Sequence, residues 1–216
     1  MLKGIFWDND GVLVDTEKLY YRASATVLRE VGIDLTREEF IERSLRRGES
    51  VFAIAAEQGY AQDTVRTLQQ KRNDRYAALL AEGIEPLHGV EEVLRALYGR
   101  VRMAIVTSSR RRHFEIIHRH TGLLPYFDFV LTREDYLRSK PDPEPYLTAL
   151  AHSGLAPEEC LVIEDTERGL RAATAAGLRC LVVPGELTAG GDFSAATAVL
   201  AGIYEVPEAL NVSGIF

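Results

Sequence analysis

Cysteine is scarce in this sequence of 216 residues, which contains only Cys160 and Cys180. Each stands in an apolar run, and the two lack the close spacing of a metal-binding or redox pair, so both are expected to be buried thiols. Long apolar runs are missing as well, because no stretch approaches the roughly 20 residues of a membrane span. The opening residues turn acidic too soon for a signal peptide. These absences predict a cytoplasmic protein of a reducing compartment with no membrane partner.

A positive net charge is also absent. The formal net charge of −7 at pH 7 would repel nucleic acids and anionic membrane surfaces, so we expect no nucleic-acid partner. The arginine-rich run at residues 110–113 opens a predicted helix and is interpreted as a solvated face. A small anionic substrate can bind such a chain only where a metal ion, a lysine or backbone amides reverse the charge locally.

Short apolar runs alternate with segments of helical period along the chain. The runs, each bounded by turn residues, are residues 5–7, 101–106, 129–131, 161–163 and 181–183. Such runs, separated by helical patterns, are typical of a parallel sheet whose connections cross over as helices. The sequence therefore predicts an α/β fold with a Rossmann-like core, in which helices cover both faces of the sheet.

An insertion separates the first apolar run from the second, because the interval is far longer than one crossover helix requires. It holds no convincing strand but several helical patterns, at residues 17–31, 37–45, 51–57 and 63–80. Thr36 and Glu39 form a capping-box pattern ahead of the second of these. We predict a small α-helical cap domain over residues 16–82, inserted after the first strand of a core made of residues 1–15 and 83–216.

The first apolar run ends abruptly in two carboxylates, Asp8 and Asp10, followed by Gly11. The carboxyl ends of strands form the ligand crevice of an open parallel sheet, so both side chains are expected there. Two carboxylates so close together are costly unless a cation offsets their repulsion. Gly11 would let the backbone turn sharply and approach a ligand closely.

A second acidic pair, Glu164 and Asp165, closes the run at residues 161–163 in the same way. Two such strand ends facing one crevice would form an oxygen-rich site suited to a hard, octahedral ion such as Mg²⁺. Neither motif contains histidine or cysteine, which argues against zinc.

Groups suited to a phosphoryl ligand follow elsewhere in the chain. Thr107 and Ser108 end the second apolar run and would present hydroxyls and backbone amides to an anion. Lys140 stands just before a predicted helix, in a loop stiffened by two prolines. A phosphoryl group held by Mg²⁺, Lys140 and Thr107 would be neutralised enough for a carboxylate to attack it. The motifs together predict phosphoryl transfer.

Four motifs stand in the order found in the haloacid dehalogenase-like hydrolases. They are Asp-x-Asp-Gly-Val at 8–12, Val-Thr-Ser-Ser at 106–109, Ser-Lys-Pro-Asp-Pro at 139–143 and Ile-Glu-Asp-Thr-x-x-Gly at 163–169. The resemblance covers the whole chain, and the predicted insertion resembles the helical cap of that superfamily. Within that superfamily, the chain resembles the helical-cap subgroup of β-phosphoglucomutase and the phosphoglycolate phosphatase-like phosphatases.

The resemblance implies a role for each motif. Asp8 would be the nucleophile, and Asp10 the general acid and base. Thr107 and Lys140 would hold the transferred phosphoryl group. Mg²⁺ would be bound by Asp8, the Asp10 carbonyl, Glu164 and Asp165.

Two positions depart from the pattern or decide between branches of the family. Asp10 disfavours 2-haloacid dehalogenation, because cleavage of a carbon–halogen bond needs no acid for its leaving group, whereas a phosphate ester does. Asn9 occupies a slot where a hydrophobic residue such as leucine is more usual. Its side chain is expected to point away from Asp8 and Asp10, because side chains alternate along a strand.

Substrate contacts are expected from the core and from the cap. The core candidates are Gly11 and Ser108, and the cap candidates are Arg47 and Arg72. Residues 71–76 are similar to a segment of the β-phosphoglucomutase cap that contributes a cation to a sugar phosphate. Asp15 and Glu17 are interpreted as hinge residues.

We therefore expect a monomeric, Mg²⁺-dependent phosphatase that hydrolyses a small phosphorylated metabolite through an aspartyl-phosphate on Asp8. A sugar phosphomutase of the β-phosphoglucomutase type is the main alternative, but Tyr20 stands where that subgroup carries a histidine. A non-catalytic metabolite-binding protein of the same fold is a more remote alternative.

Overall fold

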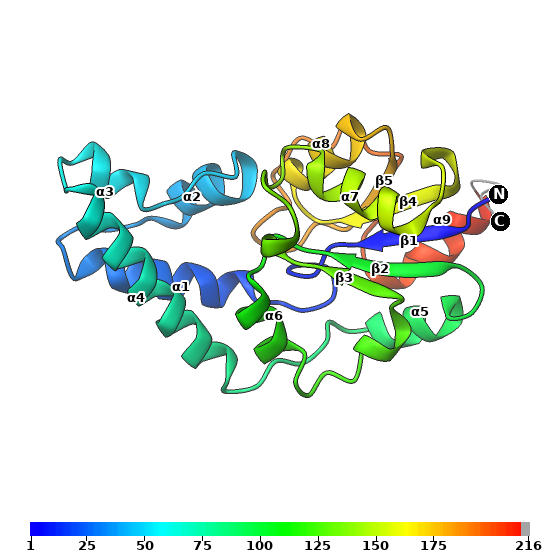
Figure 1. The fold of residues 1–216 in the computed structure, drawn as a ribbon, viewed down its shortest axis with the longest axis horizontal. Coiled ribbons are helices and arrows are strands. Elements are labelled where there is room, and N and C mark those ends of the chain that lie inside the picture. The colour runs from blue at the N-terminus through cyan, green and yellow to red at the C-terminus, as the bar shows by residue number, and fades with distance from the viewer. Residues whose placement is uncertain (213–216) are drawn as a thin grey trace.

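A parallel sheet forms the centre of the molecule in the computed structural model, which describes residues 1–212 (Figure 1). Its strands are arranged in the order β3-β2-β1-β4-β5-β6, and every neighbouring pair is parallel. The strands are β1 (Gly4–Trp7), β2 (Arg102–Val106), β3 (Phe129–Leu131), β4 (Cys160–Glu164), β5 (Arg179–Val182) and β6 (Ala198–Val199). The predicted α/β fold is confirmed. The short β6 was not predicted, because two residues are too few for an alternating pattern.

Helices cover both faces of the sheet, as predicted (Figure 1). On one face, α5 (Val90–Leu97) and α9 (Val206–Val212) share a buried apolar cluster with the strand residues Ile5, Trp7 and Ile105. On the other face, α7 (Glu144–Ser153) and α8 (Glu167–Ala175) pack against alternate residues of the same strands. Strands buried on both sides explain the continuous apolar runs. Cys160 and Cys180 lie in the second cluster as free, buried thiols.

The insertion after β1 is helical, as predicted. It contains α1 (Glu17–Arg29), α2 (Arg37–Phe40), α3 (Ala53–Glu57) and α4 (Gln62–Leu80), with a π-helical turn at Ile41–Arg46. Its helices share an apolar cluster of their own, which includes Leu28, Phe40 and Phe52. The predicted capping box is present, since Thr36 Oγ1 accepts from Glu39 N and Glu39 Oε2 from Thr36 N, both at 3.1 Å. Residues 16–82 remain the predicted limits of a cap domain.

Polar contacts join the insertion to the core on two sides. Glu186, in the loop after β5, pairs with Lys18 at 2.8 Å and with Arg37 at 2.7 Å. Near α8, Arg46 Nη2 donates to Gly190 O at 2.5 Å. The insertion therefore covers the carboxyl edge of the sheet, and residues of both line a pocket between them.

The run at residues 110–113 is not a solvated face throughout. Arg111 and Arg112, at the start of α6 (Arg111–Ile117), are exposed, but His113 is buried. Its Nε2 lies 3.1 Å from the carbonyl oxygen of Asn73 on α4, so the turn also docks against the insertion. Across residues 1–212, the longest helices are too short or too polar to cross a membrane.

Candidate active site

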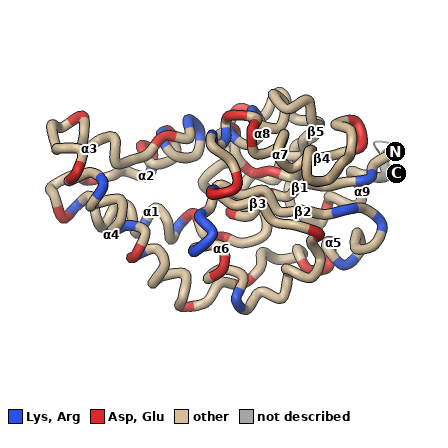
Figure 2. Tube along the Cα trace, in the orientation of Figure 1, with Lys and Arg blue, Asp and Glu red and all other residues tan. Residues whose placement is uncertain are grey.

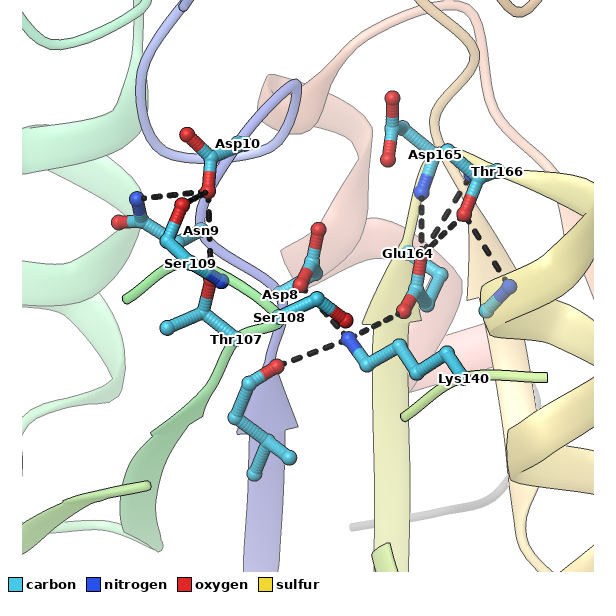
Figure 3. A network of polar contacts seen from close by, with 12 residues as sticks. Asp8, Asn9, Asp10, Thr107, Ser108, Ser109, Lys140, Glu164, Asp165 and Thr166 are labelled. Atoms are coloured by element: carbon cyan, nitrogen blue, oxygen red, sulfur yellow. Dashed lines mark hydrogen bonds and ion pairs between the residues drawn. The ribbon is translucent and has the colours of Figure 1, made fainter. Parts of the chain in front are cut away.

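Three neighbouring strands bring the predicted site residues to one edge of the sheet (Figure 3). Asp8 follows β1, Thr107 follows β2, and Glu164 ends β4 with Asp165 after it. Backbone pairing continues past the strands, because Asp8 N donates to Ile163 O at 2.9 Å and Thr107 N to Leu131 O at 2.9 Å. This pairing fixes the backbone from which the side chains project. A pocket of about 300 Å³ lies above it and reaches Asp8, Asp10 and Thr107.

Lys140 lies at the centre of the site. It is 2% exposed, and its Nζ donates to Asp8 Oδ1 at 2.6 Å, Glu164 Oε1 at 2.7 Å and Val106 O at 2.8 Å. All three ammonium protons are therefore used. Burial acts to lower the pKa of Lys140, but Asp8 and Glu164 hold it above its usual value. The result is a fixed positive charge beside Asp8.

The carboxylates around Lys140 have the composition of a cation site. Asp8, Glu164 and Asp165 each offer an oxygen, and these atoms lie within 4.8 Å of one another. Both carboxylate oxygens of Asp165 are buried without a hydrogen-bond partner among the described residues. Burial raises the pKa of Asp165 well above its usual value, and the charges of Glu17 and Glu164 raise it further. An unpaired buried carboxylate beside two others fits a divalent metal ion.

Two glycines make room for these acids. Gly11 has a φ of +87°, and a β-carbon there would lie 2.1 Å from Asp165 Oδ2. A β-carbon on Gly169, in the first turn of α8, would lie 2.0 Å from the Glu164 carboxyl group. Gly11 thus shapes the cation site as well as the turn.

Glu164 differs from Asp165 in that both of its oxygens are occupied. Oε1 accepts from Lys140 and from the Tyr146 hydroxyl, the latter at 2.6 Å. Oε2 accepts from Asp165 N at 3.2 Å and from Thr166 Oγ1 at 3.1 Å. Glu164 therefore holds Lys140 and the start of α8 in place through its hydrogen bonds. The two oxygens of Asp165, in contrast, remain free to bind a ligand.

Burial raises the pKa of Asp8 to about 7, against the lowering effect of Lys140. Glu164 and Asp10 add to the rise. Positive charge near Asp8 therefore determines whether it is available as a carboxylate.

Asp10 faces a ring of hydroxyl groups. Thr16 donates a very short hydrogen bond to Oδ1, and Oδ2 accepts from Ser109 Oγ at 2.7 Å and Thr107 Oγ1 at 3.2 Å. The Asp10 carboxylate is thus separate from the cluster that Asp8, Glu164 and Asp165 form among the described residues. Its predicted metal contact, through the main-chain carbonyl, stays a prediction.

The expectation that Asn9 points away from Asp10 is wrong. Asn9 is fully buried, and its Nδ2 donates to Asp10 Oδ2 at 3.3 Å (Figure 3). Strand alternation does not extend this far, because β1 ends at Trp7 and Leu13 N turns back to donate to Asn9 O at 2.8 Å.

The predicted substrate contacts separate into two groups. Ser108 and Arg72 line the pocket, and Gly11 lies against Asp165. Arg72 is 8% exposed, with its guanidinium 4.3 Å from the centre of the Tyr20 ring. Arg47 is instead an exposed residue paired with Glu42 at 2.8 Å, and it is not among the described residues that line the pocket.

Several pocket or network residues were not identified as site residues from the sequence: Thr16, Glu17, Ser109, Tyr146 and Arg168. Burial raises the pKa of Glu17 to about 8, and Arg168 opposes the rise. Arg168 Nε is buried without a hydrogen-bond partner among residues 1–212. The position of Arg168 between Asp165 and Gly169 in the fourth motif could have identified it from the sequence.

Figure 2 shows basic segments both at the start of α6 and where the insertion approaches α8.

Comparison with known proteins gives one consistent result. The profile of the family "Haloacid dehalogenase-like hydrolase" matches residues 5–183. The chain is 33% identical to Protein CbbY of Rhodobacter capsulatus over 206 residues, which are 90% of this chain and 91% of the relative. It is 30% identical to fructose-1-phosphate phosphatase YqaB of Escherichia coli over 178 residues, which are 81% of this chain and 93% of that protein.

A solved structure agrees with these matches. A CbbY variant from Rhodobacter sphaeroides in complex with xylulose-(1,5)bisphosphate has a TM-score of 0.81 and 28% identity, covering 95% of this chain and 96% of that one. The resemblance drawn from the four motifs is confirmed, as is the prediction of an enzyme. The chain belongs to the haloacid dehalogenase-like hydrolases.

Proposed function

We propose that this hydrolase is a Mg²⁺-dependent phosphatase that cleaves phosphate monoesters of sugars or similar small metabolites through an aspartyl-phosphate on Asp8. The observation that carries the proposal is the contact of Lys140 Nζ with Asp8 Oδ1 at 2.6 Å, beside the unpaired Asp165 carboxylate. A buried carboxylate, a fixed cation and the ligands for a metal ion suit the attraction and neutralisation of a phosphoryl group.

Asp8 supplies the nucleophile. One of its carboxylate oxygens attacks the phosphorus atom, and the bond from phosphorus to the ester oxygen breaks. Lys140 fixes Asp8 and stabilises negative charge on the transferred phosphoryl group, while Thr107 and Ser108 donate to its oxygens. The departing oxygen takes a proton from Asp10, so that a neutral alcohol leaves.

Asp10 then works in the opposite direction. It accepts a proton from a water molecule whose oxygen attacks phosphorus, and the bond between phosphorus and Asp8 breaks. Inorganic phosphate leaves, and Asp8 is again a carboxylate. The hydroxyls of Thr16 and Ser109, which donate to Asp10, can also accept a hydrogen bond. This suits a carboxyl group that gains and loses a proton in each turnover.

Asp8, Asp165 and the main-chain carbonyl of Asp10 are the proposed ligands of Mg²⁺. When bound there, the ion would supply positive charge beside the phosphoryl oxygens. Glu164 keeps Lys140 in place beside this proposed cation site. Asp165→Asn should therefore abolish both the rise in melting temperature on addition of Mg²⁺ and the activity.

The walls of the pocket support a small phosphorylated substrate. Arg72 and Arg168 both line it, and neither forms an ion pair in the described part of the chain. Arg72 Nε donates to the neutral Asn73 Oδ1 at 3.1 Å, and Arg168 Nε is buried without a hydrogen-bond partner among the described residues. Two arginines that line the pocket without a paired carboxylate favour an anionic ligand. The relatives support a sugar phosphate in particular, since YqaB is named a fructose-1-phosphate phosphatase and CbbY was solved with a sugar bisphosphate.

Hydrolysis is favoured over a phosphomutase reaction by the surroundings of Tyr20. Its ring packs edge-on against Tyr76, with centres 5.1 Å apart, and carries Arg72 on its face. The mutase subgroup has a histidine at this position. In this chain Tyr20 takes its place, and its ring is packed into the wall of the pocket.

Release of inorganic phosphate tests the proposal. We expect Mg²⁺-dependent release from fructose 1-phosphate or another sugar phosphate, none with Asp8→Asn, and normal release with Asp63→Asn, an exposed acid on α4. Turnover in EDTA equal to that with Mg²⁺, or an active Asp8→Asn variant, would contradict it. Conversion of β-glucose 1-phosphate to glucose 6-phosphate without phosphate release would indicate the mutase reaction instead.

A further inference from the structure

A row of four polar side chains runs from the end of α6 to Asp10. Thr121 Oγ1 lies 2.9 Å from His118 Nδ1. His118 Nε2 lies 2.7 Å from Asn9 Oδ1, and Asn9 Nδ2 lies 3.3 Å from Asp10 Oδ2. Asn9 is 0% and His118 5% exposed. A buried polar row of this kind is costly unless each member is paired, so its presence next to a reacting group needs a reason.

One orientation satisfies every member of the row. The carboxylate oxygen of Asp10 requires a donor, so the Asn9 amide must turn its NH₂ group toward Asp10 and its oxygen toward His118. Nε2 of His118 then carries the ring proton and donates to Asn9 Oδ1. Nδ1 is left as an acceptor, and the Thr121 hydroxyl donates to it. The donors all point in one direction, from Thr121 to Asp10.

The row reaches Asp10 from outside the pocket. Among the described residues, neither Asn9 nor His118 lines the pocket, whereas Thr16, Thr107 and Ser109, the hydroxyl partners of Asp10, all do. Those hydroxyls can rotate, and Thr107 is needed by the phosphoryl group in the proposed mechanism. The amide of Asn9 is a donor that cannot turn away, because His118 holds its other end.

We propose that Asn9 and His118 are positioning residues that keep the carboxyl group of Asp10 aimed at the leaving oxygen while its hydroxyl partners rearrange. The inference rests on the proposed role of Asp10 as acid and base. It gives a function to Asn9, the one position of the first motif that departs from the usual hydrophobic residue. Asn9 neither donates nor receives the transferred proton.

Substituting Asn9 alone would combine two effects, the loss of the contact with Asp10 and the loss of a partner for His118. Asn9→Leu leaves His118 Nε2 buried without an acceptor, which itself costs stability. The double variant Asn9→Leu/His118→Leu replaces both partners by apolar groups and avoids that cost. His118→Gln keeps an N–H donor toward Asn9 and serves as the conservative variant. Ser153→Ala removes a buried hydroxyl that donates to Leu150 O at 2.9 Å on α7 and is the remote control.

The dependence of the rate on the leaving group distinguishes a positioning role of Asn9 and His118 from a general effect of the substitutions on folding. p-Nitrophenyl phosphate has a leaving group that needs little protonation, whereas a sugar phosphate needs an acid. Release of the alcohol in a single turnover reports the first step for each ester. For the double variant, this rate should fall about tenfold or more with the sugar phosphate and change little with p-nitrophenyl phosphate, with KM unaltered. His118→Gln and Ser153→Ala should retain the wild-type ratio of the two rates.

The outcomes distinguish this inference from the proposed function. An equal loss on both esters, or no loss on either, in a folded double variant overturns the positioning role. Asp10→Asn provides the reference. If Asp10→Asn loses activity selectively on the sugar phosphate while the double variant does not, the inference fails alone. If Asp10→Asn shows no such selectivity, the acid role of Asp10 fails, and the inference with it.

Discussion

The hydroxyl of Tyr146 on α7 donates to Glu164 Oε1 at the end of β4, across 2.6 Å. The same oxygen accepts from Lys140 Nζ at 2.7 Å, and all three side chains are 2% exposed or less. Burial acts to raise the pKa of Glu164, but Lys140 and Tyr146 hold it below its usual value. Tyr146 therefore helps to keep Glu164 charged, and Glu164 in turn fixes the lysine that contacts Asp8.

Tyr146→Phe should lower the free energy of unfolding by about 1.5–3 kcal/mol, the range for a buried hydrogen bond to a charged group. Urea denaturation monitored by circular dichroism measures this loss. Tyr21→Phe is the matched control, because the Tyr21 hydroxyl donates to a neutral carbonyl, Leu35 O at 3.1 Å, and should cost about 1 kcal/mol or less. Equal losses in the two variants would mean that the charge on Glu164 does not strengthen the bond.

Gly11→Ala should abolish the stabilisation of the protein by Mg²⁺. The new β-carbon would lie 2.1 Å from Asp165 Oδ2, so the carboxylate must move away from the cation site. A thermal melt with increasing Mg²⁺ measures the effect. Gly32→Ala is the control, because Gly32 also has a positive φ, of +78°, but has no atom within 4 Å of the added carbon.

Both substitutions carry the cost of a left-handed alanine, about 1–2 kcal/mol. The difference between them therefore isolates the contact with Asp165. A Gly11→Ala variant that Mg²⁺ stabilises as much as the Gly32→Ala variant would remove Asp165 from the proposed metal ligands.

The fold, and the meeting of the candidate site residues at one edge of the sheet, were largely predictable because they depend on local signals. Apolar runs gave five of the six strands to within a few residues, since strands buried on both faces show continuous apolar sequence. Asp8, Thr107, Glu164 and Asp165 were placed together because each lies at or just after the end of a parallel strand, and parallel strands end at one edge.

The residues that were not identified depend on contacts between distant segments. Tyr146 and Glu164 are 18 positions apart, and His118 and Asn9 are 109 apart. The direction of the Asn9 side chain was predicted wrongly because the alternation of side chains along a strand was assumed to continue beyond the end of β1. Arg47 and Arg72 looked equivalent in sequence, yet the helix α4 turns Arg72 inward while Arg47 follows the π-helical turn and lies at the surface.

This difference predicts a large effect of substituting Arg72 and a small effect of substituting Arg47. Arg72→Gln should lower kcat/KM for a sugar phosphate by roughly tenfold to a hundredfold, the worth of one hydrogen bond to a charged group. Arg47→Gln should leave it within about twofold, because removing a half-exposed surface pair costs little. Steady-state phosphate release measures both. A larger effect of Arg47→Gln would mean that the insertion rearranges when substrate binds.

His118 gives the protein a stability that depends on pH. Burial lowers the pKa of His118 to about 4, with Asp10 opposing the shift, whereas an unfolded chain titrates near the usual value of about 6.5. Between these values the unfolded state binds the proton and the folded state does not, so stability is present above pH 6.5 and is lost as the pH falls toward 4.

The comparison of wild type with His118→Gln isolates this contribution, because carboxylates that titrate in the same range are common to both proteins. Gln keeps an N–H donor toward Asn9 Oδ1 but does not titrate. Between pH 7 and pH 4 the wild type should lose on the order of 3 kcal/mol more unfolding free energy than the variant. Urea denaturation at both pH values measures the difference, and His120→Gln, at an exposed histidine in the same segment, should behave as wild type. A wild type that loses no more than His118→Gln would mean that His118 takes up its proton in the folded state, which is incompatible with a neutral ring donating to Asn9.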